Sequence, residues 1–253
     1  MMQGIWGETM ADEMPVLAAS GVGKRFGALT VLDRVDFSIG ANEAVGIVGP
    51  NGAGKTTLLN VLAGSFPPAE GSVQFRGVDI TAASASERSR MGIGRAHQVP
   101  RPFGDMTVFE NVFVGASSGG GLRGAKAYDR CLEVLDLCGL LELSNRRAES
   151  LGLLHRKSLE LARALATGPV VLLLDEIGGG LTDEEAGELV LTIKQIRGQG
   201  VAIVWIEHIV HILVQVVTRL VCMDAGRVIA DGDPEAVRRD AAVIDAYLGS
   251  GVV

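Results

Sequence analysis

The sequence predicts an α/β fold in which a mostly parallel β-sheet with flanking helices carries an antiparallel β subdomain and an inserted helical lobe. Continuous apolar runs at residues 43–48, 170–175 and 201–206 are typical of parallel strands that are buried on both faces. A glycine-rich loop follows the first of these strands and opens a helix. The middle third of the chain has helical apolar spacing, unlike the segments on either side.

Length and composition indicate one globular domain over residues 16–253, preceded by a loose leader at residues 1–15. The chain has 253 residues, of which 47% are hydrophobic. Its net charge of −7 argues against a nucleic-acid surface, where a basic face is expected. No apolar run is long enough for a membrane span and no secretory signal begins the chain, so we expect an intracellular protein. Cys131, Cys138 and Cys222 lack metal-site spacing and predict buried thiols in a reducing compartment.

Short antiparallel strands are predicted for residues 16–39, where apolar alternation is broken by glycines. Phe26 lies at the end of this pattern, ahead of the glycine-rich loop. Its ring could stack on an adenine base, or it could be a strand residue that packs in the core. The local pattern leaves both interpretations open.

The glycine-rich loop has the G-x-x-x-x-G-K-[ST] spacing of a phosphate-binding loop, and residues 56–63 after it have helical spacing. Strand, loop and helix in this order predict a phosphate-loop NTPase core that binds a nucleoside triphosphate. Backbone N–H groups and the helix N-terminus would face the phosphates, Lys55 would reach the β- and γ-phosphates, and the Thr56 hydroxyl would ligate Mg²⁺. The predicted nucleotide-binding residues are Gly49, Pro50, Asn51, Gly52, Ala53, Gly54, Lys55, Thr56 and Thr57.

A further strand at residues 72–76 precedes Gln98, which lies at a strand-to-loop junction ahead of two prolines. The amide of Gln98 could meet a metal ion or a water, or it could be an ordinary loop side chain. The helical lobe is expected at about residues 99–168. Thr107 and Glu110 have capping-box spacing.

Three further segments complete the predicted lobe. Residues 117–121 indicate a flexible break, and helices are predicted at residues 125–141 and 158–166.

Two carboxylates follow the buried strand at residues 170–175, at the end where open α/β sheets bind ligands. Asp175 is the expected partner of Thr56 at Mg²⁺, through water. Glu176 could act as a general base toward the attacking water. His208 follows the strand at residues 201–206 and could contact the γ-phosphate, although a lone histidine is more often structural. Strands at 220–223 and 227–230 and a helix at 234–248 end the chain.

In order and rough spacing, these motifs resemble those of ABC transporter ATPase subunits over nearly the whole chain. The sequences around residues 22–29 and 96–112 and the ending at 246–250 are similar to the ATPases of branched-chain amino-acid importers. ATPases for urea or amide import and for lipopolysaccharide export are related alternatives. The resemblance implies adenine stacking by Phe26, a Q-loop at Gln98 that also contributes to the metal site, a catalytic Glu176 and a switch histidine at His208.

The family signature, Leu-Ser-Gly-Gly-Gln or a close variant, is replaced here by Leu151, Gly152, Leu153, Leu154 and His155. In the family this loop binds the γ-phosphate held by the other subunit of a dimer. Gly152 removes a hydroxyl, and Leu154 places a branched side chain where backbone must approach phosphate. We therefore expect a heterodimer with a second ATPase that has a normal signature. A homodimer in which the loop still donates backbone N–H groups remains the alternative.

The resemblance implies an importer ATPase on the cytoplasmic face of the membrane, with permease subunits as direct partners and a periplasmic or extracellular solute-binding protein as an indirect one. Two rival functions were weighed. A soluble ABC protein acting on ribosomes or DNA would carry two such domains or a basic surface, and neither is present. A regulatory subunit that binds ATP but hydrolyses it weakly fits the altered signature, whereas Glu176 argues against it.

Overall fold

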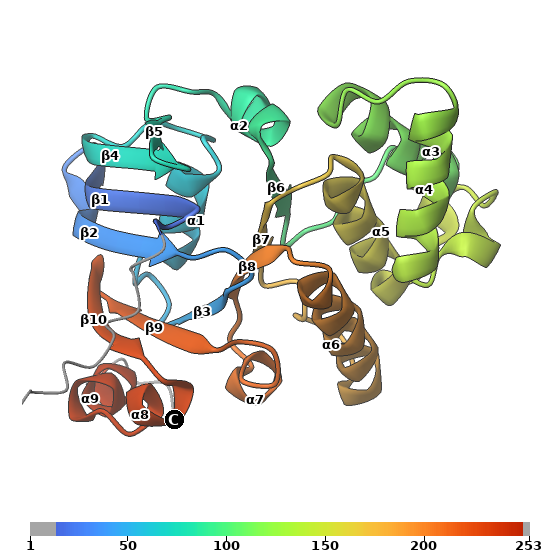
Figure 1. Ribbon diagram of the computed structural model, residues 1–253. Helices are drawn as coiled ribbons and strands as arrows, with labels where there is room; N and C mark the ends of the chain where they lie inside the picture. Colours follow the sequence, from blue (N-terminus) through green and yellow to red (C-terminus); the bar gives the residue numbers. More distant parts are fainter. Residues whose placement is uncertain (1–13, 250–253) are drawn as a thin grey trace, which may run out of the picture.

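The computed structural model describes residues 14–249. The leader predicted for residues 1–15 lies outside the described residues apart from Met14 and Pro15. Figure 1 shows an antiparallel sheet at one end, a parallel sheet in the middle and a group of helices at the other end.

The antiparallel sheet has the strand order β2-β1-β4-β5. Its two long strands form the hairpin predicted for residues 16–39, and β4 is the strand predicted for residues 72–76. The strands are β1 (Leu17–Phe26), β2 (Leu29–Ile39), β4 (Glu70–Phe75) and β5 (Val78–Asp79).

The second sheet has the order β10-β9-β3-β8-β7-β6. Neighbours from β9 to β6 run parallel, and only β10 is antiparallel to its partner. Every residue of β3, β7 and β8 is buried, as the continuous apolar runs predicted. The strands are β3 (Ala44–Val48), β6 (Ile93–Ala96), β7 (Val171–Asp175), β8 (Ala202–Ile206), β9 (Arg219–Asp224) and β10 (Arg227–Gly232).

Helices cover the parallel sheet, and two more follow its last strand (Figure 1). Helix α1 follows the glycine-rich loop, and α6 begins with a capping box in which Thr182 accepts from the Glu185 N–H. These helices are α1 (Lys55–Leu62), α2 (Ala85–Met91), α6 (Asp183–Gly198), α7 (Val210–Leu213), α8 (Pro234–Arg238) and α9 (Ala241–Gly249).

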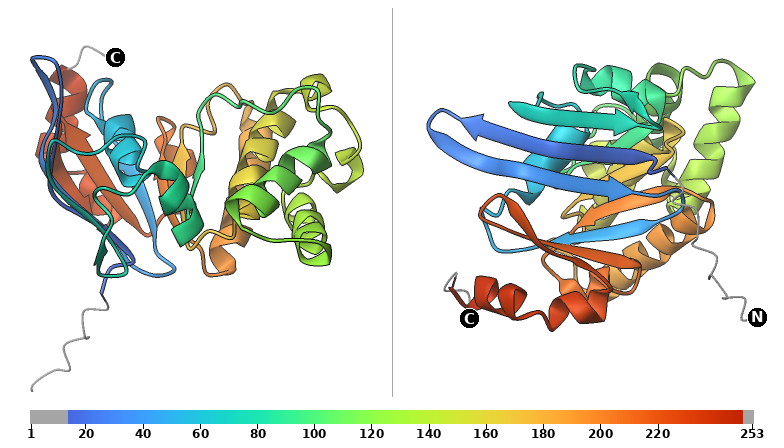
Figure 2. Two further views of the ribbon diagram at one scale, coloured as in Figure 1. Left: turned by 90° about the horizontal axis from the view of Figure 1, so that it is seen from above. Right: turned by 60° about the vertical axis from the view of Figure 1, so that its left-hand side comes forward.

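A group of helices is inserted between β6 and β7, and Figure 2 shows it standing apart from the antiparallel sheet. It begins with the predicted capping box at Thr107 and Glu110. Its elements are α3 (Val108–Val114), a π-helical turn (Gly115–Gly119), α4 (Ala125–Leu137), two short 3₁₀ turns (Leu141–Leu143 and Ala148–Ser150) and α5 (Leu153–Ala166).

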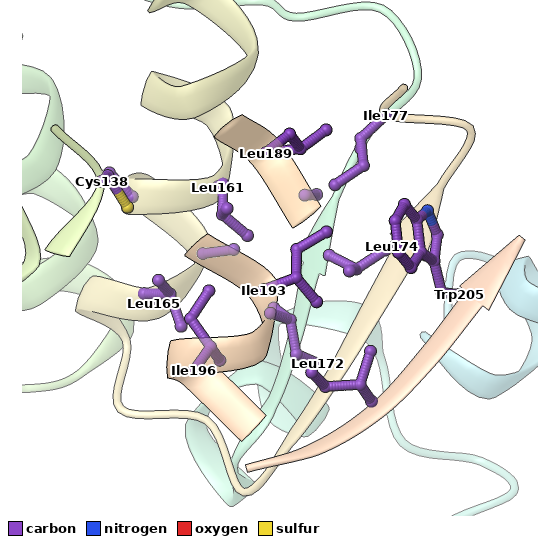
Figure 3. Close-up of a cluster of buried hydrophobic side chains, with 14 of the residues drawn as sticks. Cys138, Leu161, Leu165, Leu172, Leu174, Ile177, Leu189, Ile193, Ile196 and Trp205 are labelled. Carbon is purple, nitrogen blue, oxygen red and sulfur yellow. The ribbon is translucent and has the colours of Figure 1, made fainter. Parts of the chain in front are cut away.

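One hydrophobic cluster joins these helices to the parallel sheet (Figure 3). Leu172 and Leu174 of β7 and Trp205 of β8 face side chains of α6, among them Ile193, and α5 packs beyond them. Burial of this continuous apolar surface holds α5, α6 and β7 together. The loops before and after β7 are therefore anchored both to the parallel sheet and to the inserted helices.

The predicted break at residues 117–121 is wrong for residues 117–119 only, because the chain leaves the helix after Gly119 and is non-helical from Gly120 to Gly124. The helix continues there as a π-helical turn, in which the Ser117 hydroxyl donates to the Phe113 carbonyl at 2.7 Å. A Cβ added to Gly115 would lie 2.6 Å from the Arg163 carbonyl oxygen, so this glycine permits close helix packing.

Three other boundaries differ from the prediction. The helix predicted at 125–141 ends at Leu137, and Gly139 after it has φ 65°. The helix predicted at 158–166 begins at Leu153, with Gly152 as its N-cap. The single helix predicted at 234–248 is two helices, because the Asp240 carboxylate accepts from the Ala242 N–H and starts α9 anew.

The predicted burial of Cys131, Cys138 and Cys222 is confirmed, and all three thiols are free. Burial raises the pKa of Cys138 to about 12, which makes its thiol unreactive. Among residues 14–249, no helix is long and apolar enough to cross a membrane.

Arg88 is a fully buried arginine that ties α2 to the C-terminal end of α1. Burial lowers the pKa of its guanidinium. A positive charge at this end of a helix is favourable because the final carbonyl groups of the helix have no partner within it. The side chain donates to five backbone carbonyl groups, those of Val61, Leu62, Ile80, Thr81 and Ala83.

We expect Arg88→Met to lower the free energy of unfolding by about 3 kcal/mol, because buried carbonyl groups lose a charged donor. Denaturant unfolding of both proteins measures this loss. The matched control is Arg90→Met on the same helix, where an exposed arginine donates to Ser86 and the expected change is under about 0.5 kcal/mol. Equal unfolding midpoints for the two variants would contradict this role of Arg88.

Candidate active site

The predicted site residues follow four neighbouring strands of the parallel sheet, in the order β3-β8-β7-β6. Because these strands are parallel, their carboxyl ends meet at one edge. The glycine-rich loop follows β3, His208 follows β8, Glu176 follows β7 and Gln98 follows β6. The fold thus brings together residues that lie far apart in the sequence.

The glycine-rich loop requires glycine at both ends for steric reasons. Gly49 has φ 142°, and a Cβ added there would lie 2.0 Å from the Met223 carbonyl oxygen of β9. Gly54 has φ 100°, and a Cβ there would lie 2.8 Å from the Val31 carbonyl oxygen. No side chain fits at either position, so the loop is confined between β9 and β2.

Lys55 is the first residue of α1, and only 5% of its surface is exposed. Its ammonium group donates to the carbonyl oxygens of Gly49 at 2.6 Å and Pro50 at 2.9 Å, across the loop. Burial lowers the pKa of Lys55, while the charges of Glu176 and Asp175 oppose that shift. The ammonium group is therefore held inside the loop, where a phosphate would meet it.

Asp175 ends β7 and is 3% exposed. The Thr56 hydroxyl donates to its Oδ1 at 3.3 Å, which places two of the three predicted metal ligands side by side. Its Oδ2 pairs at 3.0 Å with Arg95 of β6, which also donates to Asn60 at 2.6 Å. Sequence reasoning did not single out Arg95, although a charged residue within a buried parallel strand was an available signal.

Glu176 has a left-handed backbone, with φ 46°, which is uncommon for a residue other than glycine. Both of its carboxylate oxygens are engaged. His208 Nε2 lies 2.8 Å from Oε1, and the Gln98 amide donates to Oε2. The three predicted catalytic side chains from three strands thus form one hydrogen-bonded group.

Glu207 was also missed as a site residue, although it directly precedes His208. It is 2% exposed, and its carboxylate accepts from the backbone N–H groups of Gly178 and His208. Burial raises the pKa of Glu207, and the charge of buried Lys157 on α5 counters that shift. This carboxylate links the loop after Glu176 to the loop that carries His208.

Phe26 ends β1 and its ring is 49% exposed. It packs edge-on against Phe66, with 5.5 Å between the ring centroids. The adjoining strand β2 reaches Gly54 through Val31. Partial exposure near the loop agrees with base stacking, and the contact with Phe66 agrees with a packing role, so the role of Phe26 stays a prediction.

The altered signature loop lies at the start of α5. Gly152 is the N-cap, without a side-chain capping bond, and a Cβ there would meet no atom within 4 Å. Leu153 is 44% exposed and lies next to Gly180, because its Cδ2 is 3.3 Å from a Cβ added there. Leu151 is buried, Leu154 is half-buried and His155 is exposed.

The residues present fit a nucleotide and Mg²⁺. The loop supplies backbone N–H groups and a buried ammonium group for phosphate, and Thr56 and Asp175 supply adjacent oxygen ligands of the kind that Mg²⁺ prefers. Among the described residues, no group of three or more His, Cys, Asp and Glu side chains could hold a metal ion. A Mg²⁺ ion bound by few protein ligands and by substrate phosphates is consistent with that finding.

Comparisons with known proteins agree with this geometry. Residues 32–178 match the ABC transporter family, and residues 227–253 match the branched-chain amino acid ATP-binding cassette transporter family. The chain is 36% identical over 250 residues to the high-affinity branched-chain amino acid transport ATP-binding protein LivG of Salmonella typhimurium, covering 93% of this chain and 98% of that protein. It is 33% identical to BraF of Pseudomonas aeruginosa, with the same coverage.

Solved structures show the same fold. A nucleotide-free ATP-binding cassette from an ABC transporter has a TM-score of 0.84 and 29% identity, covering 92% of this chain and 99% of that one. An ATP-binding cassette in its ADP conformation also has a TM-score of 0.84, with 30% identity and coverage of 94% and 100%. The chain therefore belongs to the ABC transporter family, as one of its ATP-binding cassettes, the subunits that hydrolyse ATP.

Proposed function

We propose that this ATPase powers the uptake of branched-chain amino acids through membrane permease subunits. The names of the relatives support this solute class, since they match over nearly the whole length of both chains. The match of residues 227–253 to a branched-chain cassette family supports it independently. The solute-binding protein of such an importer would be an indirect partner, and the cassette would lie on the cytoplasmic face of the membrane.

The observation that carries the catalytic proposal is the grouping of Gln98, Glu176 and His208 beside the Thr56–Asp175 pair. In the proposed mechanism, a water attacks the γ-phosphorus of ATP in line, the bond to the bridging β–γ oxygen breaks, and ADP leaves. Glu176 accepts a hydrogen bond from that water and then takes its proton. Gln98 and His208 hold its carboxylate in position and respond to the γ-phosphate.

Thr56 and Asp175 would hold Mg²⁺, with Gln98 as a further oxygen ligand. When bound, the ion would offset negative charge on the β- and γ-phosphates. Arg95 holds the second oxygen of Asp175, so the carboxylate keeps Oδ1 beside Thr56. Lys55 and the backbone N–H groups of the loop would bind the phosphates, and Phe26 would stack on the adenine.

We expect Glu176→Gln to lower ATP turnover by at least about 100-fold, because the amide cannot accept a proton from water. ATP affinity should change little, since the phosphate loop is intact. Phosphate release and ATP binding by the purified protein are the two measurements. Glu142→Gln, an exposed carboxylate within the helical group, is the control, and equal turnover by both variants would contradict the role of Glu176.

We also propose that the cassette pairs with a second ATPase subunit whose signature loop is intact. The N-terminal turn of α5 still presents backbone N–H groups, as an anion site needs. Around it, however, Leu153 and Leu154 replace residues that in the family carry little or no side chain. Apolar side chains at a phosphate-binding turn keep the phosphate from approaching the backbone N–H groups closely. The altered loop of this chain would therefore weaken contacts to the nucleotide that the partner subunit binds.

A repaired loop tests this proposal. The double variant Gly152→Ser, Leu154→Gly should raise ATP turnover of the purified chain by about 10- to 100-fold, because donors aimed at developing charge are worth about 10²–10³ in rate. The space around Gly152 admits the serine side chain. The single variant Gly152→Ser separates the hydroxyl from the backbone effect. If the unaltered chain already turns over ATP as fast as the repaired one, a homodimer is the correct assembly.

A groove of about 770 Å³ lies between the helical group and the edge of the parallel sheet. It contains Gln98 and Asp175 together with Arg101, Arg163 and the exposed Val99. We propose that a cytoplasmic segment of the permease docks in this groove. A segment bound there would contact the loop that carries Gln98 and so connect the permease to the ATP site.

We expect Val99→Asp to abolish co-purification with the permease subunits from detergent extracts, because it adds a charge to the docking surface. ATP turnover of the isolated chain should stay within about twofold of the original value. Leu191→Asp on α6 is the matched control, since Leu191 is as exposed as Val99 but does not line the groove. A Val99→Asp cassette that still assembles normally would exclude this docking site.

A further inference from the structure

The C-terminal helix α9 reaches the start of the phosphate loop. The backbone N–H of Gly49 donates to the Tyr247 hydroxyl at 2.8 Å, although the two residues are 198 positions apart. Figure 1 shows α9 beside α8, next to β10 at the end of the sheet. Tyr247 lies within the ending at residues 246–250 that carries part of the family resemblance, but that pattern alone does not predict this contact.

Helix α9 is held to the protein along a narrow face. Val243 and Tyr247 are one helical turn apart, so they lie on the same side of the helix. Val243 is buried and Tyr247 is half-buried, whereas Ile244 and Leu248 are exposed. A helix with so small a buried surface depends strongly on each of its contacts. The hydrogen bond to the Tyr247 hydroxyl therefore helps to hold α9 in place as well as to position the loop.

Gly49 is the point at which the loop has least freedom. The Met223 carbonyl closes one side of it, and its own carbonyl accepts from Lys55. The hydrogen bond that the Gly49 N–H donates to Tyr247 fixes the peptide group before Gly49, and the hydrogen bond that Lys55 donates to the Gly49 carbonyl fixes the one after it. Loss of the hydroxyl would leave a half-buried N–H group without this acceptor and would free the loop to rotate.

We propose that Tyr247 is a positioning residue for the phosphate loop, so that α9 and nucleotide binding are coupled. If the docked helix favours the binding-competent loop, bound nucleotide must stabilise the docked helix by the same factor. This inference rests on the nucleotide-binding role of the loop. It assigns to the C-terminal segment a function in ATP binding.

Tyr247→Phe removes only the hydroxyl, and we expect it to weaken ADP binding by about tenfold, which corresponds to about 1.4 kcal/mol. Calorimetric titration of the purified full chain with ADP and Mg²⁺ gives this affinity without any need for hydrolysis. For ATP turnover we expect a higher KM with an unchanged kcat. The matched control is Tyr128→Phe, because Tyr128 is a half-exposed tyrosine on α4, far along the chain from the loop.

A second measurement uses the unaltered protein and so does not depend on how well the variant folds. Bound ADP should slow amide hydrogen exchange in residues 241–249 of the unaltered chain. Equal ADP affinity for Tyr247→Phe and the unaltered chain, or no effect of ADP on exchange in α9, would overturn the proposal. An unaltered chain that failed to bind ADP would instead contradict the nucleotide site itself, and the coupling would fall with it.

Discussion

The close approach of Gly49 to the Met223 carbonyl group is the constraint on which the rest of the site depends. The parallel pairing of β3 with β9 brings the two backbones together, and only glycine fits between them. The carbonyl groups of the loop that follows hold Lys55, and its last glycine, Gly54, passes close to β2. A phosphate-binding loop of fixed shape is therefore a result of sheet packing rather than of loop sequence alone.

Opposite charges are arranged around this loop at the edge of the parallel sheet. Lys55 and Arg95 lie near Asp175, and Lys157 lies near Glu207. Burial disfavours each isolated charge, so each depends on its neighbours for stability. A triphosphate with its metal ion brings both signs of charge into the same space.

Residue patterns predicted the strands well, because β3, β7 and β8 are buried on both faces and their apolar runs have no competing interpretation. Gln98, Glu176 and His208 each follow a predicted strand, but the pattern alone left the roles of Gln98 and His208 open, and the family resemblance supplied them. Contacts such as Tyr247 with Gly49 or Arg95 with Asp175 were not predictable, because they join side chains whose positions only the packed fold defines. The glycines near residue 117 led to one prediction that is wrong in part. Gly115, Gly119 and Gly120 pack closely against α5 and its C-terminal end, whereas Gly121 has open space around it, and composition alone cannot distinguish packing from flexibility.

The most direct test of the account is ATP binding by the purified chain, measured beside Lys55→Met. The substitution keeps an unbranched side chain of similar length but removes the ammonium group that lies across the loop. The account predicts that the unaltered chain binds ATP with Mg²⁺ and that Lys55→Met binds it at least about tenfold more weakly, because charge-assisted contacts to phosphate are lost. Equal affinity of the two proteins would contradict the assignment of residues 49–57 as the nucleotide site.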